Sequence, residues 1–507
     1  MNFKRNVVIF TLIICIFFSI SCVVAGDIND TEIAAYETQI VGDANDELIN
    51  SPQEDLVSTS EGDLITYSQE DSVSSSDVGT FTELQNIIYD ASPGDTINLE
   101  KDYVYDEGFN YGQGILILKD LTINGNGHTL DGASKSRILF NFFSVKVTLN
   151  NIIFENGYTK LYGGAIVNFA DLTVNNCAFK RNYADTTAGA ICSLASLNCQ
   201  NSVFYKNTAN GSAGAIFSCN IKKADSYFNK SKLNPLDLDI KGLISDLLND
   251  FSFVPGTDSI SNCEFTKNVA LGRGGGAIYA FNHIKIVSST FTSNKANEDG
   301  GAVYGAKNLV IKYSQFTKNT ASVYGGAVYF KFHELAGHYD ANWKWQTDVK
   351  FYSNLIKNCV FTINVAKDRG GAIYGFKYSG SPKVEAANAV KCTFKDNLAD
   401  FGNEIFGGTL TNCALKNTLT LSTVTVKKSA KSVDLYVKLK SGSKPLKYQK
   451  VTFTFNGKTY KAKTNYKGIA KVTINSDVLK KLKVGKNIFY QASYGKYHDK
   501  KIAKVYK

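Results

Sequence analysis

One segment of the chain carries the residue types of a zinc-protease motif. His333-Glu334-Leu335-Ala336-Gly337-His338 places a glutamate between two histidines. Such a motif holds its metal with histidines four residues apart, on one face of a helix. Here the histidines are five residues apart, which separates them by about 140° around a helix. The spacing therefore predicts no metal site and no cofactor at this segment.

Carboxylates are candidates for a different chemistry, the cleavage of polysaccharides. Enzymes that cleave polysaccharides need carboxylates clustered on one face, for acid/base work or for calcium, with a basic residue beside them. Asp368 and Arg369 form one such neighbouring pair, but the equivalent positions of the repeats described below carry other residues. The remaining candidates fall on different repeats and corners: Asp131, Asp171, Asp185, Asp299, Asp396 and Asp400. The sequence therefore predicts no cluster of catalytic residues.

Aromatic residues are the candidates for ligand binding. Residues 330–354 contain both tryptophans of the chain, Trp343 and Trp345, together with His333 and His338. Binding functions concentrate in loops that leave a rigid scaffold, so this loop is the first choice for ligand contact. The alternative is that its aromatic side chains pack against the scaffold.

A second aromatic set follows a recurring glycine phrase and consists of Tyr279, Tyr304, Tyr329 and Tyr374. If these tyrosines face outward, they form a ridge that can stack on sugar rings. If they face inward, they belong to the core. Periodicity alone leaves both alternatives open, because the glycines reset the alternation of the strands.

The elements that position these residues are repeats. The phrase Gly-Gly-Ala-(Ile/Val), twice with alanine as its first residue, occurs seven times, and four of the six steps between its copies are 25 residues long. A second phrase, Phe-x-x-Asn-x-Ala, keeps the same phase. Its asparagines are Asn182, Asn207, Asn268, Asn294, Asn319, Asn364 and Asn397. A fixed step of this length indicates a solenoid.

Each repeat has only brief alternating runs, so it cannot bury a core alone. Stacked as coils of a parallel β-helix, about 4.8 Å apart, equivalent residues form columns. The phenylalanines then form an internal stack, and the asparagines form a ladder of side-chain amides at an inward-facing turn. The glycine pair supplies a tight corner. The predicted fold is therefore all-β.

Cysteines agree with this geometry. Five of them stand two residues before the phenylalanine position, where other repeats have serine: Cys177, Cys263, Cys359, Cys392 and Cys413. This column predicts buried thiols. The alternative is a disulfide between Cys392 and either Cys359 or Cys413.

The two phrases resemble the repeats of chlamydial polymorphic outer-membrane proteins and of adhesin-like surface proteins of methanogenic archaea. This resemblance covers residues 79–417 and implies a right-handed parallel β-helix of the pectate-lyase-like type. The run from Leu121 to Gly132 is similar to early coils of pectate-lyase-like proteins. Turn and core motifs of this kind specify a fold rather than a function.

The N-terminal part predicts export. Residues 1–25 have Lys4 and Arg5, an apolar run, and then Val23 and Ala25 at the spacing of a signal peptidase site. The alternatives are a retained membrane anchor and a lipoprotein acylated at Cys22. Residues 26–78 hold fourteen Asp and Glu and many serines, which indicates a disordered acidic spacer or a pro-peptide. After removal of the signal, no apolar run is long enough to span a bilayer.

The folded part of the chain is expected to begin near Thr80. Thr80 and Glu83 have the spacing of a capping box, and the helix that follows is expected to end before Ser92 and to cover the open end of the first coil. Two insertions interrupt the period, at residues 223–255 and 330–354. The first has apolar residues at helical spacing and predicts a short amphipathic helix.

Residues 418–507 form a different domain. Short alternating runs and the Asn456-Gly457 turn predict an immunoglobulin-like β-sandwich, similar to modules of archaeal and bacterial surface proteins. Residues 416–507 contain 23 Lys and three Asp, and such a charge attracts polyanions. In an exported chain the expected partners are envelope polymers or surface glycans, of the same or another cell, rather than nucleic acid.

The favoured function is a secreted or cell-surface adhesin-like protein whose β-helix presents a binding surface for carbohydrate or envelope components. In this hypothesis the basic domain holds the protein to the surface. A polysaccharide lyase or glycoside hydrolase is the alternative, and a purely structural envelope protein is the third class.

Overall fold

The computed structural model describes residues 77–142, 145–222, 254–331, 333–339, 345–352, 354–376, 388–415, 418–441, 444–495 and 497–507. The predicted signal peptide and spacer, and the helix expected in the first insertion, lie outside these residues. All described elements belong to one compact unit, Val73–Lys507. No helix of the described part is long and apolar enough to cross a membrane.

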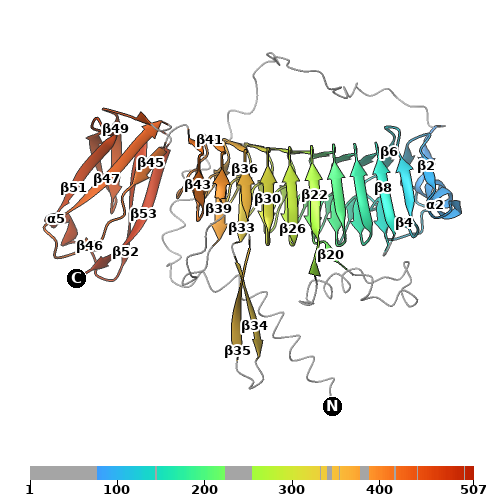
Figure 1. Cartoon of the computed structure of the whole chain (residues 1–507), viewed down its shortest axis with the longest axis horizontal. Coiled ribbons are helices and arrows are strands. Elements are labelled where there is room, and N and C mark those ends of the chain that lie inside the picture. The colour runs from blue at the N-terminus through green and yellow to red at the C-terminus, as the bar shows by residue number, and fades with distance from the viewer. Residues whose placement is uncertain are drawn as a thin grey trace. The chain divides into compact units, whose positions relative to one another are not determined.

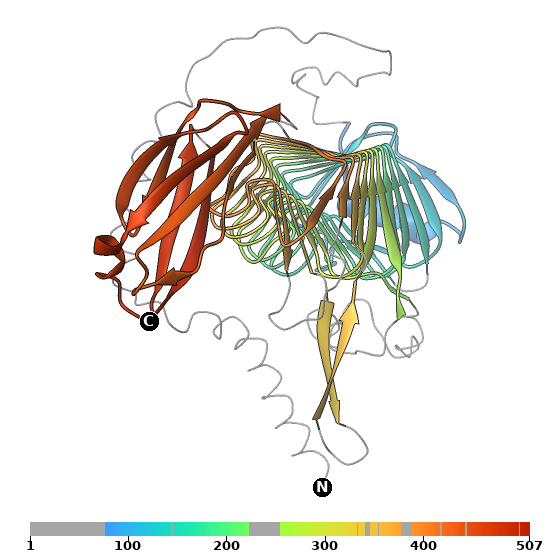
Figure 2. The same cartoon turned by 60° about the vertical axis from the view of Figure 1, so that its left-hand side comes forward.

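Residues 79–415 form a right-handed parallel β-helix, as predicted (Figure 1). Each full coil passes through four sheets in turn, and equivalent residues of successive coils pair in register. Phe154 pairs with Phe179, for example, and Phe179 pairs with Phe204. Figure 2 shows the resulting stacks of strands.

The strands of the four sheets are as follows. The 12-stranded sheet consists of β1 (Gly79–Thr80), β3 (Tyr103–Val104), β6 (Thr129–Asp131), β9 (Ile153–Glu155), β13 (Ala178–Lys180), β17 (Val203–Tyr205), β23 (Glu264–Thr266), β27 (Thr290–Thr292), β31 (Gln315–Thr317), β37 (Val360–Thr362), β41 (Thr393–Lys395) and β44 (Ala414–Leu415). The 11-stranded sheet consists of β2 (Thr96–Asn98), β5 (Leu121–Asn124), β8 (Lys146–Asn150), β12 (Asp171–Asn175), β16 (Leu197–Gln200), β22 (Thr257–Ser261), β26 (His283–Val287), β30 (Leu309–Lys312), β36 (Leu355–Lys357), β40 (Asn388–Val390) and β43 (Thr409–Thr411). The 10-stranded sheet consists of β4 (Ile115–Ile117), β7 (Leu139–Asn141), β11 (Ile166–Asn168), β15 (Ile191–Ser193), β19 (Ile216–Ser218), β25 (Ile278–Ala280), β29 (Val303–Gly305), β33 (Val328–Lys331), β39 (Ile373–Phe376) and β42 (Ile405–Phe406). The 7-stranded sheet consists of β10 (Tyr158–Thr159), β14 (Tyr183–Ala184), β18 (Thr208–Ala209), β24 (Val269–Ala270), β28 (Lys295–Ala296), β32 (Thr320–Ala321) and β38 (Val365–Ala366).

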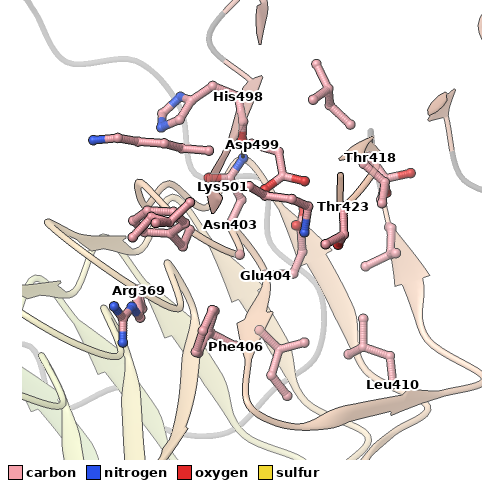
Figure 3. Close-up of a pocket in the computed structure, with 18 residues that line it drawn as sticks. Arg369, Asn403, Glu404, Phe406, Leu410, Thr418, Thr423, His498, Asp499 and Lys501 are labelled. Carbon is pink, nitrogen blue, oxygen red and sulfur yellow. Dashed lines mark hydrogen bonds between the residues drawn. The ribbon is translucent and has the colours of Figure 1, made fainter. Parts of the chain in front are cut away.

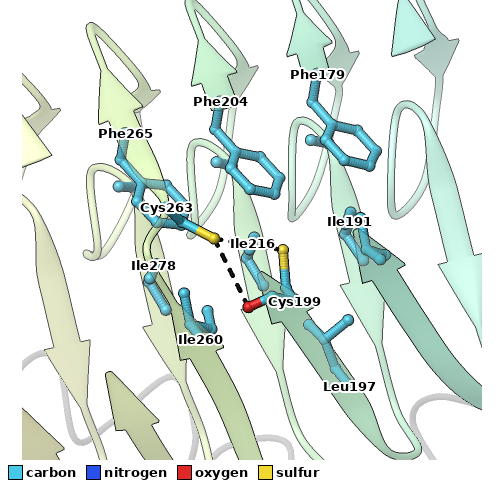
Figure 4. Packing of buried hydrophobic residues seen from close by; sticks show 14 of the residues in the cluster. Phe179, Ile191, Leu197, Cys199, Phe204, Ile216, Ile260, Cys263, Phe265 and Ile278 are labelled. Carbon is cyan, nitrogen blue, oxygen red and sulfur yellow. Dashed lines mark hydrogen bonds between the residues drawn. The ribbon is translucent and has the colours of Figure 1, made fainter. Parts of the chain in front are cut away.

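The phenylalanine column fills the interior. Ring centroids of successive members, from Phe154 to Phe394, are 4.7–5.0 Å apart, and the rings are nearly parallel. Figure 4 shows three of these rings beside Cys199 and Cys263. All eight cysteines after the signal region are free thiols, and seven are buried, whereas Cys413 in the last coil is half-buried. Burial is thus confirmed for four members of the predicted column.

The asparagine column lies inside the adjoining turn and is buried from Asn182 to Asn397. In Asn294, the side-chain Nδ2 donates to Phe265 O (2.8 Å) and to Asn319 Oδ1 (3.0 Å). The same Oδ1 also accepts from the backbone N of Asn294 (3.0 Å). Asn294 Oδ1 in turn accepts from the backbone N and the Nδ2 of Asn268 (both 3.0 Å). Every polar atom of the amide is therefore bonded, which offsets the desolvation cost of its burial.

The two glycines of each corner have different roles. The first, such as Gly300, has a φ of 64°, a conformation that is unfavourable for residues with a Cβ. The second, such as Gly301, would place a Cβ within 2.1 Å of Gly326 O in the next coil. Alanine replaces the first glycine at Ala188 (φ 66°) and Ala213 (φ 63°), whereas the second is invariant among the seven copies.

Helix α2 (Phe81–Asp90) covers the first coil, as expected. Thr80 Oγ1 accepts from Glu83 N (3.1 Å) and caps the helix. Gln85 of the helix exchanges two hydrogen bonds with the backbone of Leu116 in β4. The helix therefore satisfies the edge of the 10-stranded sheet, which would otherwise be open to pairing.

The first insertion leaves the coils through an antiparallel pair, β20 (Ile221–Lys222) and β21 (Val254–Pro255). A buried carboxyl group stabilises this exit. Asp258 occupies a core column between Leu197 and Ile284 of the neighbouring coils, and accepts from Ser218 Oγ (2.5 Å), Asn220 Nδ2 (2.6 Å) and Leu197 N (3.0 Å). Burial raises its pKa to about 7.

The second insertion is a hairpin rather than an irregular loop. Strands β34 (His333–Tyr339) and β35 (Trp345–Phe351) pair antiparallel over seven residues each. Figure 1 shows the hairpin extending away from the coils. A strand also lacks the helical geometry that a zinc-protease motif requires at residues 333–338.

Residues 418–506 form two sheets around a separate core, in agreement with the predicted sandwich. The four-stranded sheet consists of β45 (Thr418–Leu421), β47 (Ser432–Ser441), β48 (Lys444–Pro445) and β51 (Ile469–Asn475). The five-stranded sheet consists of β46 (Val426–Lys427), β53 (Tyr497–Tyr506), β52 (Asn487–Tyr494), β49 (Lys450–Phe455) and β50 (Lys458–Lys463), and the short helix α5 (Ser476–Leu479) follows β51. Asn456 and Gly457 turn the β49–β50 hairpin, both with positive φ. The immunoglobulin-like class stays a prediction.

Candidate functional site

The tyrosine column lies on the outer face of the 10-stranded sheet. In β25, Ile278 and Ala280 belong to the main core, so Tyr279 between them points to the opposite face. Tyr304, Tyr329 and Tyr374 occupy the same position of β29, β33 and β39. They form a hydrophobic cluster separate from the main core.

The tyrosine rings cover one another. Centroids are 4.4 Å apart between Tyr279 and Tyr304 and 4.5 Å between Tyr304 and Tyr329. Tyr374 continues the stack, Phe217 covers its first ring and Phe406 its last. Exposed fractions are only 5–8 % for the three tyrosines after the first. The column therefore offers a ligand no free ring face.

A corner beside this column brings ionisable groups together. Asp299, Tyr324, Arg369 and Phe401 lie on successive coils along this corner. The guanidinium of Arg369 lies 5.8 Å from the Tyr324 ring centroid and 5.2 Å from that of Phe406. Burial, reinforced by the neighbouring Glu298, raises the pKa of Asp299 to about 7.

Two further carboxylates reach the same corner. Asp368 lies 3.5 Å from the Arg369 guanidinium, and Asp400 follows it on the next coil. Burial raises the pKa of Asp368, and Asp400 adds to this effect. The neighbouring His498 side chain lowers the pKa of Asp400. The expectation that the aspartates are scattered is therefore wrong for Asp299, Asp368 and Asp400, because coil stacking aligns corners that are far apart in sequence.

The last coil contacts the sandwich through polar groups. Tyr497 Oη donates to Asp396 Oδ1 (2.6 Å), and Asn403 Nδ2 donates to His498 O (3.2 Å). Asp400 forms an ion pair with Lys500 (Oδ2 to Nζ, 3.7 Å), and its Oδ1 lies 3.8 Å from Nε2 of His498. These contacts link β53 to the end of the β-helix.

A pocket of about 630 Å³ lies beside these contacts. Figure 3 shows Arg369, Glu404 and Phe406 on the side of the coils, and Thr418, His498 and Lys501 on the side of the sandwich. Its apolar lining includes Ile405, Leu410, Leu415, Leu419 and Ile502. Ten of its eighteen lining residues are polar or charged, and concave sites with convergent polar groups are where small ligands bind.

Glu404 has the most unusual setting in this pocket. In the paired coil its position is that of Ala372, a core residue. Burial raises the pKa of Glu404 to about 7. The pocket therefore combines a carboxyl group that titrates near neutral pH with the permanent cation of Arg369.

The structure does not bring all predicted site residues together. His333 and His338 lie in β34 and Trp345 begins β35, but the side chains of these strands lie outside the described residues, as does Trp343 entirely. Opposite Trp345 the hairpin places Tyr339. Within the described part of the chain, no three His, Cys, Asp or Glu side chains gather as metal ligands do.

Sequence reasoning missed Tyr324, Glu404 and His498 as site residues. A signal for Glu404 was available, because Gly402-Asn403-Glu404-Ile405 aligns with the Gly-Gly-Ala-Ile phrase and places a carboxyl at the alanine position. No signal could indicate His498, since its place depends on how the sandwich meets the last coil.

The geometry defines a parallel β-helix with an outer aromatic column that ends beside a pocket. Three segments of the chain, residues 262–280, 288–306 and 313–331, match the repeat of Chlamydia polymorphic membrane proteins. No curated protein and no solved structure matches the chain. The similarity therefore applies to these three coils.

Proposed function

We propose that the chain is an exported surface protein of the adhesin-like type. Its β-helix presents a binding surface for carbohydrate or other envelope components, and its basic sandwich holds it to the surface. The observation that carries the proposal is the match to a membrane-protein repeat. The three matching coils carry Tyr279, Tyr304 and Tyr329, and the hairpin begins directly after the third.

The hairpin is the first ligand-contacting element of this proposal. It leaves the strand that carries Tyr329, and its backbone projects from a rigid stack, as binding loops do. Trp345 is the first residue of β35 and pairs with Tyr339, the last residue of β34, and Trp343 precedes it by two residues in the sequence. Aromatic residues are favoured at binding surfaces because they bury much area for little loss of side-chain entropy.

The coil period allows a sharp test of the hairpin. Residues 332–351 number 20, and the step between Asn319 and Asn364 is 45 rather than 25. Deleting residues 332–351 therefore restores the normal step and leaves Tyr352, Ser353 and Asn354 in the link to the next strand. The complete protein and this deletion variant would be applied to a glycan array. We expect loss of the bound glycans with an unchanged midpoint of thermal unfolding.

The pocket is the second contacting element, because it joins the end of the aromatic column to ionisable groups. Arg369→Gln removes one cation of the pocket, which Lys500 and Lys501 also line. Lys285→Gln, at an exposed position of β26, is the matched control. Weaker binding in Arg369→Gln alone would support a pocket that takes an anionic chain end. Equal binding by both variants and by the hairpin deletion would overturn the proposal that the β-helix binds glycans.

Cleavage of an acidic polysaccharide is a second candidate function. The observation that favours it is the corner pair, Asp368 and Asp400, whose pKa values are shifted in opposite directions beside Arg369. Paired carboxyls with separated pKa values suit acid/base catalysis. Release of reducing ends or unsaturated products from a panel of acidic polysaccharides, abolished in Asp368→Asn, would establish an enzyme. If no member of the panel yields a product, this activity on those substrates is excluded.

A further inference from the structure

The outer face of the five-stranded sheet has an unusual set of side chains. In β49, Val451, Phe453 and Phe455 point into the core, so Lys450, Thr452 and Thr454 point outward. The pairing of the strands places further residues on the same face: Thr459, Lys461, Lys463, Asn487, Phe489, Gln491, Ser493, His498, Lys500, Ile502 and Lys504. We refer to these fourteen positions as the lysine face.

On β49 and β50 the lysines of this face have no carboxylate partner among the described residues, whereas Lys500 of β53 pairs with Asp400. Lys450 pairs directly with Lys463, and Lys461 stands two residues further along β50 on the same side. Like charges directly opposite each other destabilise a sheet. The three aspartates of the sandwich lie elsewhere: Asp434 binds Lys471 of the four-stranded sheet (2.7 Å), Asp477 belongs to α5, and Asp499 accepts from Leu421 N.

Protection of a sheet edge does not explain this arrangement. Lysines on an edge strand prevent pairing with other chains, and β50 is such an edge. Lys450 and Lys504, however, belong to β49 and β53, which are flanked by strands on both sides. Lys450 thus faces Lys463 from an inner strand, and a polyanion that covers the face would relieve this repulsion.

The neutral residues of the face indicate which polyanion fits. Threonine, glutamine and asparagine side chains alternate with the lysines, and these groups bond to hydroxyls. Phe489 is 50 % exposed and lies under Lys500 Nζ at 4.7 Å, so it offers a ring that a sugar can contact. The sandwich contains no arginine, the residue that binds phosphate groups with paired hydrogen bonds.

We propose that the lysine face binds a linear acidic polysaccharide whose charges are carboxylates. The free part of the face lies on β49, β50 and β52, since His498 and Lys500 of β53 already contact Asp400 of the last coil. This inference rests on the proposed surface attachment and assigns it to one face of one sheet.

The test compares two triple variants of the full chain that have the same net charge. Lys450, Lys461 and Lys463 are changed to Gln in the first. In the second, Lys431, Lys438 and Lys467, exposed residues in or next to strands of the four-stranded sheet, are changed to Gln. Each protein is titrated with polygalacturonate at low and at physiological salt. We expect binding about tenfold weaker in the first variant, equivalent to about 1.4 kcal/mol, and nearly unchanged in the second.

Phe489→Ser provides a variant without a charge change, and it should also weaken binding to polygalacturonate. Equal losses in both triple variants would overturn the assignment to this face and leave attachment by net charge alone. Tighter binding to duplex DNA, or to vesicles of phosphatidylglycerol and phosphatidylcholine, than to polygalacturonate would overturn the ligand class. None of these outcomes depends on glycan binding by the hairpin, which the deletion of residues 332–351 tests separately.

Discussion

Asn319 Nδ2 lies 2.9 Å from Asn364 Oδ1 and 2.9 Å from Phe291 O, so one amide bridges the backbone of one coil and the side chain of another. Its own Oδ1 accepts two further bonds from Asn294. The Asn319 side chain therefore makes four hydrogen bonds, two as donor and two as acceptor. In the interior of the β-helix, a polar group left without such a partner is costly.

Replacing Asn319 by Leu is expected to destabilise the β-helix strongly. The change leaves polar groups of Asn294, Phe291 and Asn364 with fewer partners, at a cost of about 1–3 kcal/mol for each buried group left unsatisfied. The midpoint of thermal unfolding, followed by circular dichroism, measures the effect. Thr317→Leu, at a half-buried outward position of the same coil, is the control. An unchanged midpoint in Asn319→Leu would contradict the role of the ladder.

The two corner glycines should differ in their tolerance of alanine. Gly300→Ala would bring a Cβ to 2.4 Å from Val303 O of the same turn, but Ala188 occupies the equivalent position at φ 66°. The turn therefore accommodates alanine, and the change should cost about 1 kcal/mol. Gly301→Ala places a Cβ against the backbone of the next coil and should cost about 3 kcal/mol or more, because that backbone cannot move without separating the coils. Chemical denaturation of both variants provides the comparison. Similar losses of stability in the two variants would contradict the distinct roles of the two glycines.

Thiol reactivity should follow burial. Cys177, Cys192 and Cys219 are buried, and burial raises the pKa of each thiol, to about 12 for the first two. Cys413 is half-buried at the last coil. In native buffer near neutral pH we expect Cys413 to react first with an aromatic disulfide reagent and the other thiols only after unfolding. Rapid reaction of Cys177, Cys263, Cys359 or Cys392, the buried members of the column, would contradict its inward orientation.

The β-helix should lose stability as pH rises from about 4 to about 7. Burial raises the pKa of Asp258 and Asp299 from 3.8 to about 7, so the folded chain binds more protons than the unfolded chain in this window, and the free energy of unfolding falls as pH increases. Asp258→Asn removes one of these titrations and should flatten the dependence. A slope that is the same in wild type and Asp258→Asn would assign the effect to other groups.

The columns of equivalent residues in the β-helix were predictable from the sequence, because they depend only on the 25-residue period. The phenylalanine stack and the asparagine ladder need only the assumption that residues 25 apart lie above one another, and the capping helix needs only local signals at Thr80 and Glu83. The side of the sheet on which the tyrosines lie was not predictable, because Gly-Gly corners interrupt the alternation. Distinguishing a hairpin from a loop at residues 330–354 required the cross-strand pairing of β34 with β35.

The candidate site was less accessible than the fold. Asp299, Arg369 and Asp400 are far apart in the chain, and their corner forms only because insertions of different length return to the same register. The pocket depends on how His498 and Tyr497 meet the last coil, a contact between two domains that carries no local sequence signal. Glu404 is the exception, since an acidic residue in an alanine column marks a position where packing alone does not determine the residue type.

Equal spacing between coils has a consequence for how such a gene can change. Each coil contacts mainly the coil before and the coil after it, and its ends lie one register step apart. Unequal recombination that adds or removes 75 nucleotides, the coding length of 25 residues, would therefore leave the ladder and the aromatic stack continuous. The number of coils, and hence the length of the β-helix, can vary among descendants while the packing of the core stays the same.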